Sequence, residues 1–311
     1  MMAGDNPIDF VIPWVNGEDP DHVALRRQYQ QSAGFEVADE VNAARRWSDA
    51  GEIRICLSSI AAHAPWVRKV WVITNGQQPP LEDLSEHFRK KIEVVGHERI
   101  FHGHDACLPT FNSLAIGTAA WRLEGLADRF VYFNDDTFLL GDIKPQDFFI
   151  GDDTILRGKW QTSDPAEYVT KIYRSSKLNA AAMAGFGPDR WFSLAHCPIA
   201  MDKRILADFF ARSPDALAAN LSHRFRDGSQ FSISSLFAHL ALRANRANFP
   251  GKKDWKTFDS TWCESASARD LFAALILNKL KWRKLVCIND LAPIVAGRSR
   301  LTRLFSSLIS A

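Results

Sequence analysis

Short apolar runs, most of them closed by Asn, Asp or Gly, constrain the fold of this chain more than any other feature. The runs span residues 9–15, 69–74, 91–95, 129–133 and 285–288. Between them, at 52–62 and 112–126, apolar residues recur every three or four positions, which is typical of helices. This alternation predicts an α/β fold, with a mostly parallel, Rossmann-like sheet flanked by helices.

The pattern changes after residue 150. Helical spacing of apolar residues recurs at 178–184, 204–210 and 232–242, with loops between these stretches. We therefore expect a largely helical section packed over the carboxyl-terminal rim of the strands. The expected units are an α/β core (1–150), a mainly helical section (151–285) and a return to the core with a basic tail (286–311).

Composition narrows the class of protein. The formal net charge is +2 and 24% of residues are charged, so nothing global indicates nucleic-acid binding. Five dispersed cysteines without a CxxC pair argue against a disulfide framework or a zinc knuckle. Residues 1–7 lack a signal-peptide pattern and no apolar run reaches the ~20 residues of a membrane span. We expect a cytoplasmic, globular protein.

The predicted strands deliver polar residues at their ends. These are Asn16-Gly17, Asn75-Gly76, Asn134-Asp135-Asp136 and Asn289-Asp290. In an open parallel sheet they would meet at one rim, where ligands bind; the alternative is ordinary turn chemistry. Asp135 and Asp136 are the natural ligands for Mg²⁺, or Mn²⁺, bridging diphosphate oxygens. Motifs of P-loop kinases, dinucleotide-binding dehydrogenases and HExxH proteases are absent.

Two further residues have a suggestive context. His196 precedes Cys197-Pro198 in a predicted loop and is a candidate general base for an acceptor hydroxyl. Arg224, within a His-Arg-Phe-Arg-Asp segment, has the planar fork that suits phosphate. The alternatives are a structural or surface histidine and a surface salt bridge.

These residues also form an ordered pattern that resembles the Stealth family. The first block is DFVIPWVNG (9–17), and the second runs through RWSDAGEIR (46–54), APWVRKV (64–70), VITNGQ (72–77), LPTFNS (108–113) and FVYFNDD (130–136). The third consists of HCP (196–198) with RFR (224–226), and the fourth is CIND (287–290). The resemblance is extensive over residues 8–140 and sparser beyond.

The resemblance implies a GT-A-like nucleotide-sugar-binding fold in 1–150, with the acceptor and catalytic section in 151–285. It implies transfer of a hexose or N-acetylhexosamine 1-phosphate from a UDP-sugar to a glycan hydroxyl, with release of UMP, in capsular or cell-surface polysaccharide synthesis. In the implied site, Asp135 and Asp136 manage the metal, His196 is the base, Arg224 binds phosphate and Asp290 supports the metal or the histidine. The nucleotide-sugar pocket would be lined by Asn16, Gly17, Arg54, Asn75, Gly76, Asn112 and Ser113.

Two rival functions remain at this point. A metal-dependent glycosyltransferase would use the same fold and metal but attack the sugar C1 and release UDP. A sugar-binding or nucleotide-binding protein would bind without turnover. An Asn-Asp-Asp sequence in place of the usual D-x-D argues against the first, and the combined Asp, His and Arg set argues against the second.

The tail offers a possible partner. Leu301, Leu304, Phe305, Leu308 and Ile309 fall at helical spacing beside Arg298, Arg300 and Arg303. Such a helix suits peripheral contact with the inner membrane face, and its alternative is a terminal helix packed against the protein.

Overall fold

A five-stranded sheet lies at the centre of the computed structural model, which describes residues 6–32, 47–162, 172–295 and 299–310. The strand order is β10-β4-β1-β2-β3, with β4, β1, β2 and β3 parallel and β10 antiparallel at the edge. Their bounds are β1 (Ile8–Pro13), β2 (Val70–Thr74), β3 (Ile92–Gly96), β4 (Arg129–Tyr132) and β10 (Ile199–Asp202). The predicted mostly parallel α/β sheet is confirmed.

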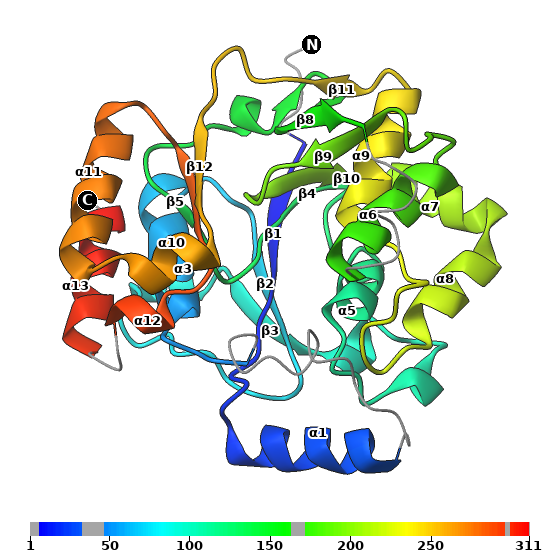
Figure 1. Ribbon diagram of the computed structural model, residues 1–311, viewed down its shortest axis with the longest axis horizontal. Helices are drawn as coiled ribbons and strands as arrows, with labels where there is room; N and C mark the ends of the chain where they lie inside the picture. Colours follow the sequence, from blue (N-terminus) through cyan, green and yellow to red (C-terminus); the bar gives the residue numbers. More distant parts are fainter. Residues whose placement is uncertain (1–5, 33–46, 163–171, 296–298, 311) are drawn as a thin grey trace.

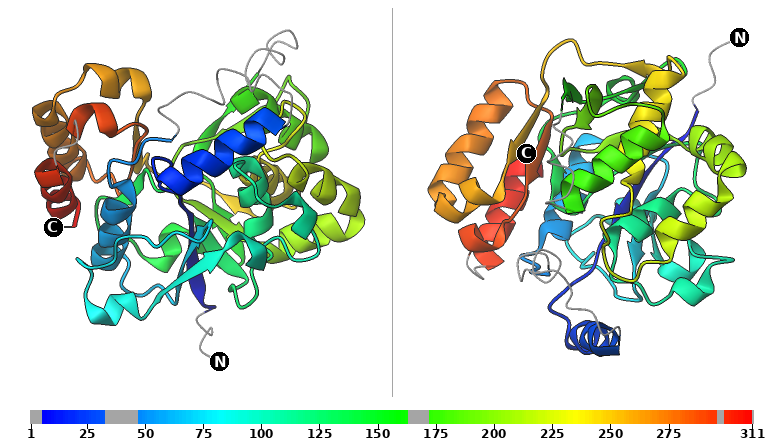
Figure 2. Two further views of the ribbon diagram at one scale, coloured as in Figure 1. Left: turned by 90° about the horizontal axis from the view of Figure 1, so that it is seen from below. Right: turned by 45° about the vertical axis from the view of Figure 1, so that its right-hand side comes forward.

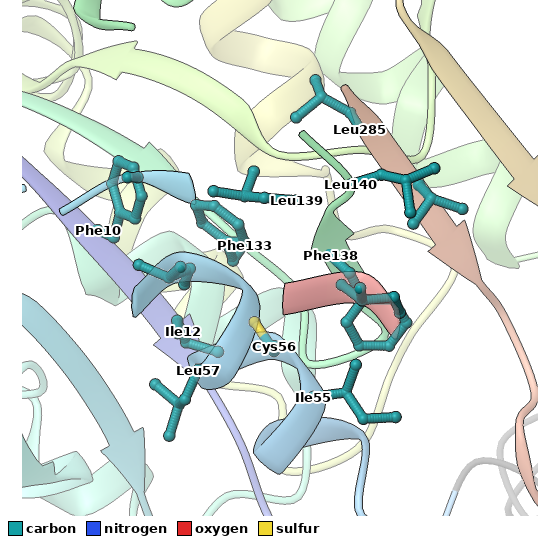
Figure 3. Close-up of a cluster of buried hydrophobic side chains, with 14 of the residues drawn as sticks. Phe10, Ile12, Ile55, Cys56, Leu57, Phe133, Phe138, Leu139, Leu140 and Leu285 are labelled. Carbon is teal, nitrogen blue, oxygen red and sulfur yellow. The ribbon is translucent and has the colours of Figure 1, made fainter. Parts of the chain in front are cut away.

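The central strands are apolar on both faces because helices cover both. In β1, Phe10 and Ile12 belong to one hydrophobic cluster, and Val11 between them belongs to the other. Side chains alternate between the two faces of a strand, so a continuous apolar run buries both sides. Figure 3 shows the first cluster, where Phe10 and Ile12 face Leu57 of the neighbouring helix.

Two groups of helices sandwich the sheet (Figure 1). One face is covered by α3 (Glu52–His63), α10 (Ser260–Ser265), α11 (Ala268–Leu280), α12 (Ala292–Val295) and α13 (Ser299–Ser310). The other is covered by α5 (Ser113–Ala120), α6 (Ile172–Met183), α7 (Lys203–Arg212), α8 (Pro214–Leu221) and α9 (Ile233–Arg243). Shorter helical elements are α4 (Glu86–Arg89), η2 (His97–Arg99), η3 (Asp105–Cys107) and η4 (Pro145–Asp147).

Smaller sheets attach the later segments to this core. Their strands are β5 (Thr137–Leu139), β6 (Phe149–Ile150), β7 (Asp153–Ile155), β8 (Gly158–Gln161), β9 (Trp191–Leu194), β11 (Ala247–Asn248), β12 (Trp255–Phe258) and β13 (Leu285–Ile288). Most important for the site, β13 pairs parallel with β12 and antiparallel with β5. The 151–285 section contains the strands β7 to β12 as well as the helices α6 to α11.

Several helices, including α1, α8, α10 and α11, have no counterpart among the helices that the sequence predicts. Helix α1 (Pro20–Ser32) lies apart from both layers, below the carboxyl ends of the strands (Figures 1 and 2). Proline suits a first helical position, and Asp19 Oδ1 accepts a hydrogen bond of 2.9 Å from the His22 amide. Of its residues only His22 is buried, so no apolar stripe marks the helix in the sequence.

The C-terminal helix forms where its apolar spacing predicts. Phe305 and Ile309 are buried and α13 packs against α3, so the structure matches the alternative of a packed terminal helix. Arg46 and Arg298 lie outside the described residues. Within the part of the chain that the structure describes, no helix has the length and apolarity needed to cross a bilayer.

Candidate active site

The strand order fixes where a ligand would bind. The chain leads from β1 to β2 and β3 on one side and returns to β4 on the other side of β1. Open parallel sheets bind ligands where the order reverses, beyond the carboxyl ends of the strands. In this molecule that point lies after Pro13 of β1 and Tyr132 of β4, so Asn16, Asp135 and Asp136 sit at it.

Side chains from three distant segments meet beyond β4. His196 Nε2 lies 2.7 Å from Asn134 Nδ2 and 3.4 Å from Asp136 Oδ1. On the other side of the same carboxylate, Cys287 Sγ donates to Asp136 Oδ2 at 3.6 Å. We call Asp136, His196 and Cys287 the three-residue cluster; one potential ligand atom from each lies within 4.8 Å of the other two.

The backbone holds this cluster in place. Thr137 Oγ1 donates to the Asn134 carbonyl at 2.7 Å, closing a turn between β4 and β5. The Ile288 amide donates to the Asp136 carbonyl at 3.0 Å, which continues the β5–β13 pairing and brings Cys287 beside Asp136. The loop between β9 and β10 supplies His196, and Thr257 Oγ1 donates to its carbonyl at 3.3 Å.

Asp136 tunes the basicity of His196. Burial alone would lower the pKa of this imidazole, but the charge of Asp136 and the contact with it outweigh burial and raise the pKa above 6.5. Asn134 is the only other side chain within hydrogen-bonding distance of Nε2 among the described contacts. When the Asn134 amide donates to Nε2, this nitrogen carries no proton and its lone pair points at the Asn134 amide.

Four carboxylates crowd the same rim. Burial, followed by the charges of Asp136, Glu52 and Asp49, raises the pKa of Asp135 well above its ordinary value. The pKa of Glu52 rises to about 7, mainly through burial and with contributions from the charges of Asp49 and Asp136. Burial also raises the pKa of Asp49. Like charges held this close favour either protons or a divalent cation between them.

The donor set fits a divalent cation at Asp135 and Asp136. Asp136 Oδ1 is buried and accepts no hydrogen bond from the described part of the chain, although His196 Nε2 lies 3.4 Å away. A buried carboxylate oxygen without a donor is costly, and a bound cation would satisfy it. Hard oxygen ligands of this kind suit Mg²⁺ or Mn²⁺.

Two predicted pocket residues connect neighbouring strand ends. The Asn16 amide donates to Gln77 Oε1 at 2.7 Å, and Gln77 Nε2 donates back to the Asn16 carbonyl at 3.1 Å. The side-chain amide nitrogen of Asn75 lies 2.9 Å from Nδ1 of His22. These contacts link the ends of β1 and β2 to each other and to α1, over the switch point.

The two predicted glycines are explained by backbone geometry. A Cβ on Gly17 would lie 2.4 Å from the Trp47 carbonyl oxygen, so only glycine permits this close approach. Gly76 has a φ of +102°, which disfavours any side chain. The backbone at the rim therefore requires both glycines, and neither offers a side chain to a ligand.

Asn112, Ser113 and Arg224 belong to a second group. The Asn112 amide group is buried and donates to the carbonyls of His223 (2.9 Å) and Phe225 (2.8 Å). Arg224 donates to the carbonyls of Pro109 (2.6 Å) and Ala106 (3.0 Å). The described contacts thus use both side chains to join two loops, and none reaches the three-residue cluster.

Arg226 is nearer to the acidic rim. It donates to Ser113 Oγ at 3.0 Å, and its charge acts on Tyr132, the residue that also feels the charge of Asp135. The sequence drew attention to Arg224 in this segment, and it carried no signal that favours Arg226 over Arg224.

Arg54 and Asp290 lie at the margin. Arg54 forms ion pairs with Glu82 and Asp83. Asp290 follows β13, is 9% exposed and lies near Cys263, whose pKa rises to about 11 mainly through burial. No sequence pattern marks Glu52, Asp49 and Cys287 as site residues. Acidic residues such as Asp49 and Glu52 are common where a helix begins, and Cys287 lies within an apolar strand.

Comparison with known proteins agrees with this architecture. The Stealth protein family matches in its conserved region 1 at residues 6–32 and in its conserved region 2 at residues 46–156. Both matches end before His196 and Cys287. Together they contain the ends of β1, β2 and β4, together with the crowded carboxylates.

Individual relatives are named as phosphotransferases. The capsular polysaccharide phosphotransferase CpsJ of Streptococcus thermophilus is 34% identical over 171 residues, which are 55% of this chain and 69% of that protein. The exopolysaccharide phosphotransferase SCO6023 of Streptomyces coelicolor is 32% identical over 312 aligned residues, covering 98% of this chain and 51% of the relative. This chain therefore spans about half the length of that second relative.

Among solved structures, the galactosyltransferase LgtC, crystallised with donor and acceptor sugar analogs, covers 96% of both chains. Its sequence identity is 12% and its TM-score 0.43, values from which nothing about chemistry follows. The sequence matches are decisive by contrast, because two conserved regions occur in order and a relative covered over more than two thirds of its length is 34% identical. This chain belongs to the Stealth protein family.

Proposed function

We propose that this chain transfers a sugar 1-phosphate from a UDP-sugar to a hydroxyl of a glycan, releasing UMP, in the synthesis of a capsular or other extracellular polysaccharide. The observation that carries the proposal is the pairing of His196 with Asp136 at the switch point of the sheet, 3.4 Å apart. The names of the relatives, which are polysaccharide phosphotransferases, support the reaction class.

In this mechanism His196 is the general base. An acceptor hydroxyl that displaces the Asn134 amide from Nε2 gives its proton to that nitrogen. The hydroxyl oxygen forms a bond to the β-phosphorus of the donor, the bond from that phosphorus to the bridging oxygen breaks, and UMP leaves with the bridging oxygen. Asp136 stabilises the imidazolium that results, since its charge already raises the pKa of His196.

The remaining residues position the donor. Asp135 and Asp136 would hold Mg²⁺ or Mn²⁺, which supplies positive charge to diphosphate oxygens when bound. Arg226 and Arg224 are the candidate phosphate-binding cations; Arg226 has the stronger case because its charge acts on Tyr132 beside Asp135. Asn16, Gly17, Asn75, Gly76 and Gln77 would form the wall of the pocket, with Arg54, Asn112, Ser113 and Asp290 in supporting positions.

The nucleotide released by purified protein tests this function. The protein is incubated with Mg²⁺, a panel of UDP-sugars and glycan acceptors, and products are separated by ion-exchange chromatography. We expect UMP, formed only when an acceptor is present. UDP would instead mean attack at the sugar C1, as in a glycosyltransferase. Tight donor binding with neither product, under every metal and acceptor, would indicate a binding protein.

We also propose peripheral contact with an anionic membrane, at a place that differs from the predicted one. The apolar side of α13 is used internally, whereas α11 turns Leu277 (49% exposed) and Leu280 (73% exposed) outward, followed by Trp282 at 85%. Eight basic and two acidic residues lie between 268 and 311. Exposed apolar side chains among cations suit an anionic lipid surface.

Co-sedimentation with vesicles tests this contact. Wild type should pellet with vesicles of anionic phosphatidylglycerol and remain in solution with zwitterionic ones, and the double variant Leu280→Ser, Trp282→Ser should lose binding. Equal pelleting of wild type and variant would exclude the α11 face. Concentration-dependent dimerisation that the variant abolishes would assign the face to a second copy of the chain.

A further inference from the structure

The three-residue cluster combines an oxygen, a nitrogen and a sulfur ligand, and this mixture is unusual for a magnesium enzyme. Mg²⁺ prefers oxygen ligands in octahedral geometry. Imidazole and thiolate suit zinc and related transition ions, which bind four ligands in a tetrahedron. The chemistry of Asp136, His196 and Cys287 therefore selects a different ion from the one that suits Asp135 and Asp136.

Two separations within the cluster are close to those of a zinc site. Zn–N bonds of ~2.0 Å and Zn–S bonds of ~2.3 Å, at tetrahedral angles, place neighbouring ligand atoms roughly 3.3–3.7 Å apart. The observed separations are 3.4 Å from His196 Nε2 to Asp136 Oδ1 and 3.6 Å from Cys287 Sγ to Asp136 Oδ2. The two contacts use different oxygens of one carboxylate, and one ligand atom from each of the three residues lies within 4.8 Å of the other two.

The cluster is also accessible from one side. Cys287 is fully buried beneath the other two ligands, whereas the side chains of His196 and Asp136 are 28% and 18% exposed. An incoming ion would meet the imidazole and the carboxylate first and the thiol last. Three protein ligands with one open position is the arrangement of zinc sites that bind a water molecule or substrate.

We propose that this cluster is a Zn²⁺ site that inhibits the enzyme, because zinc at Asp136, His196 and Cys287 excludes the productive use of two of them. Zinc occupies the Nε2 lone pair that would take the acceptor proton, and it withdraws Asp136 from the hard-cation position. Binding displaces the Asn134 amide from Nε2 and releases the thiol proton of Cys287 to solvent. The inhibitory part of this proposal rests on the proposed function; the zinc site itself does not.

Cobalt provides a direct readout of the site. Co²⁺ takes the same tetrahedral geometry as Zn²⁺ and shows a thiolate-to-metal charge-transfer absorption in the near ultraviolet when a cysteine sulfur is a ligand. The full chain is titrated with Co²⁺ in excess Mg²⁺, and Zn²⁺ is then added. We expect the charge-transfer absorption to appear, persist in excess Mg²⁺ and disappear as Zn²⁺ replaces Co²⁺.

Cysteine variants assign the sulfur. Cys287→Ser should abolish the absorption and weaken Zn²⁺ binding at least tenfold or so, as even outer partners of a metal ligand contribute ~10–100-fold. Cys107→Ser, in the half-buried η3 segment, is the matched control and should retain both. Cys197→Ser and Cys263→Ser should also retain the absorption, although these thiols are near enough to influence Cys287. Circular dichroism checks folding, and Cys287→Ala is a second variant if serine is not tolerated.

The outcomes separate the two proposals. No charge-transfer absorption in wild type, or absorption that persists in folded Cys287→Ser, overturns the zinc site. Absorption assigned to Cys287 in a protein that releases no nucleotide leaves the site standing and removes the proposed function. Where both hold, micromolar Zn²⁺ should suppress UMP release and a chelator should restore it, while Cys287→Ser should be at least tenfold less sensitive to Zn²⁺. UMP release that Zn²⁺ leaves unchanged would overturn the inhibitory role.

Discussion

Asp9 lies in β1 and Asp136 lies just beyond the neighbouring strand β4, and the two carboxylates differ in how many hydrogen bonds they accept. Asp9, near the amino end of β1, is fully buried and accepts hydrogen bonds from Arg68 Nε (2.7 Å), Trp71 Nε1 (2.9 Å) and the Ala127 amide (2.9 Å). Asp136, beyond the carboxyl end of β4, has one buried oxygen without a hydrogen bond and lies among other carboxylates.

The difference separates a structural charge from a chemical one. Arg68, Trp71 and Ala127 together donate to both oxygens of Asp9, so most of the acceptor capacity of this carboxylate is already used. Asp136 keeps unused acceptor capacity next to a histidine and a thiol, which is the condition for binding a cation or supporting proton transfer. An aspartate therefore stabilises the fold at the amino ends of the strands, and another is available for a ligand at their carboxyl ends.

The largest effect should come from removing the structural charge. Asp9→Ala leaves the Arg68, Trp71 and Ala127 donors without their acceptor, and we expect a loss of ~2–4 kcal/mol in unfolding free energy. Urea denaturation at pH 7.5 measures it. Activity per folded molecule should stay unchanged below the transition. If Asp9→Ala unfolds at the same urea concentration as wild type, Asp9 does not stabilise the fold, and its proposed difference from Asp136 is wrong.

Next in size is the loss of the proposed base. His196→Ala should lower turnover by roughly 10²-fold or more, because no other group in the described contacts replaces Nε2. Steady-state UMP release measures it, with His102→Ala, an exposed histidine, as the matched control. Thermal unfolding should be close to wild type in both variants. Wild-type turnover in folded His196→Ala would remove the base assignment.

The smallest expected effect concerns the crowded carboxylates and depends on pH. The folded-state pKa of Glu52, about 7, exceeds its ordinary value of 4.5, so the folded protein holds an extra proton between these values and loses stability as pH rises through them. Glu52→Gln should therefore be more stable than wild type at pH 8, by ~1–3 kcal/mol, and nearly equal to it at pH 4.5.

Urea unfolding across pH 4.5–8, without divalent cations, checks this dependence. Saturating Mg²⁺ should reduce the difference, since a cation offsets the repulsion that the substitution relieves. Parallel pH profiles of the unfolding free energy for wild type and Glu52→Gln would show that the pKa of Glu52 is not raised in the folded protein.

The sheet could be predicted from sequence because its central strands β1, β2 and β4 are buried on both faces. Residues 69–74, 91–95 and 129–133 are apolar runs with polar ends, and the observed strands differ from them by at most one residue at either end. Helix α1 could not be predicted in this way, since it buries only His22. The predicted helix 112–126 ends early, at Ala120, and turns follow it, the second of which contains Gly125 with a φ of +81°.

The site could be predicted only in part. Strand-end logic identified Asp135 and Asp136, and family resemblance identified His196. The contribution of Cys287 depends on the pairing of β13 with β5, a three-residue strand with no sequence pattern of its own. Glu52 and Asp49 approach the rim because α3 begins there, which requires the packing of that helix on the sheet. The roles of Asp135, Asp136, His196, Arg224, Asp290 and the pocket residues all stay predictions, as do the boundaries of the three sections.

The position of β13 in the chain has a consequence for biosynthesis. The parallel strands β1 to β4 are complete once residue 132 has emerged from the ribosome, but Cys287 and Asp290 follow more than 150 residues later. A nascent chain can thus form its sheet well before the rim beyond β4 receives its last side chains. A ligand of the rim would therefore meet its complete set of side chains only on chains whose synthesis has passed residue 290.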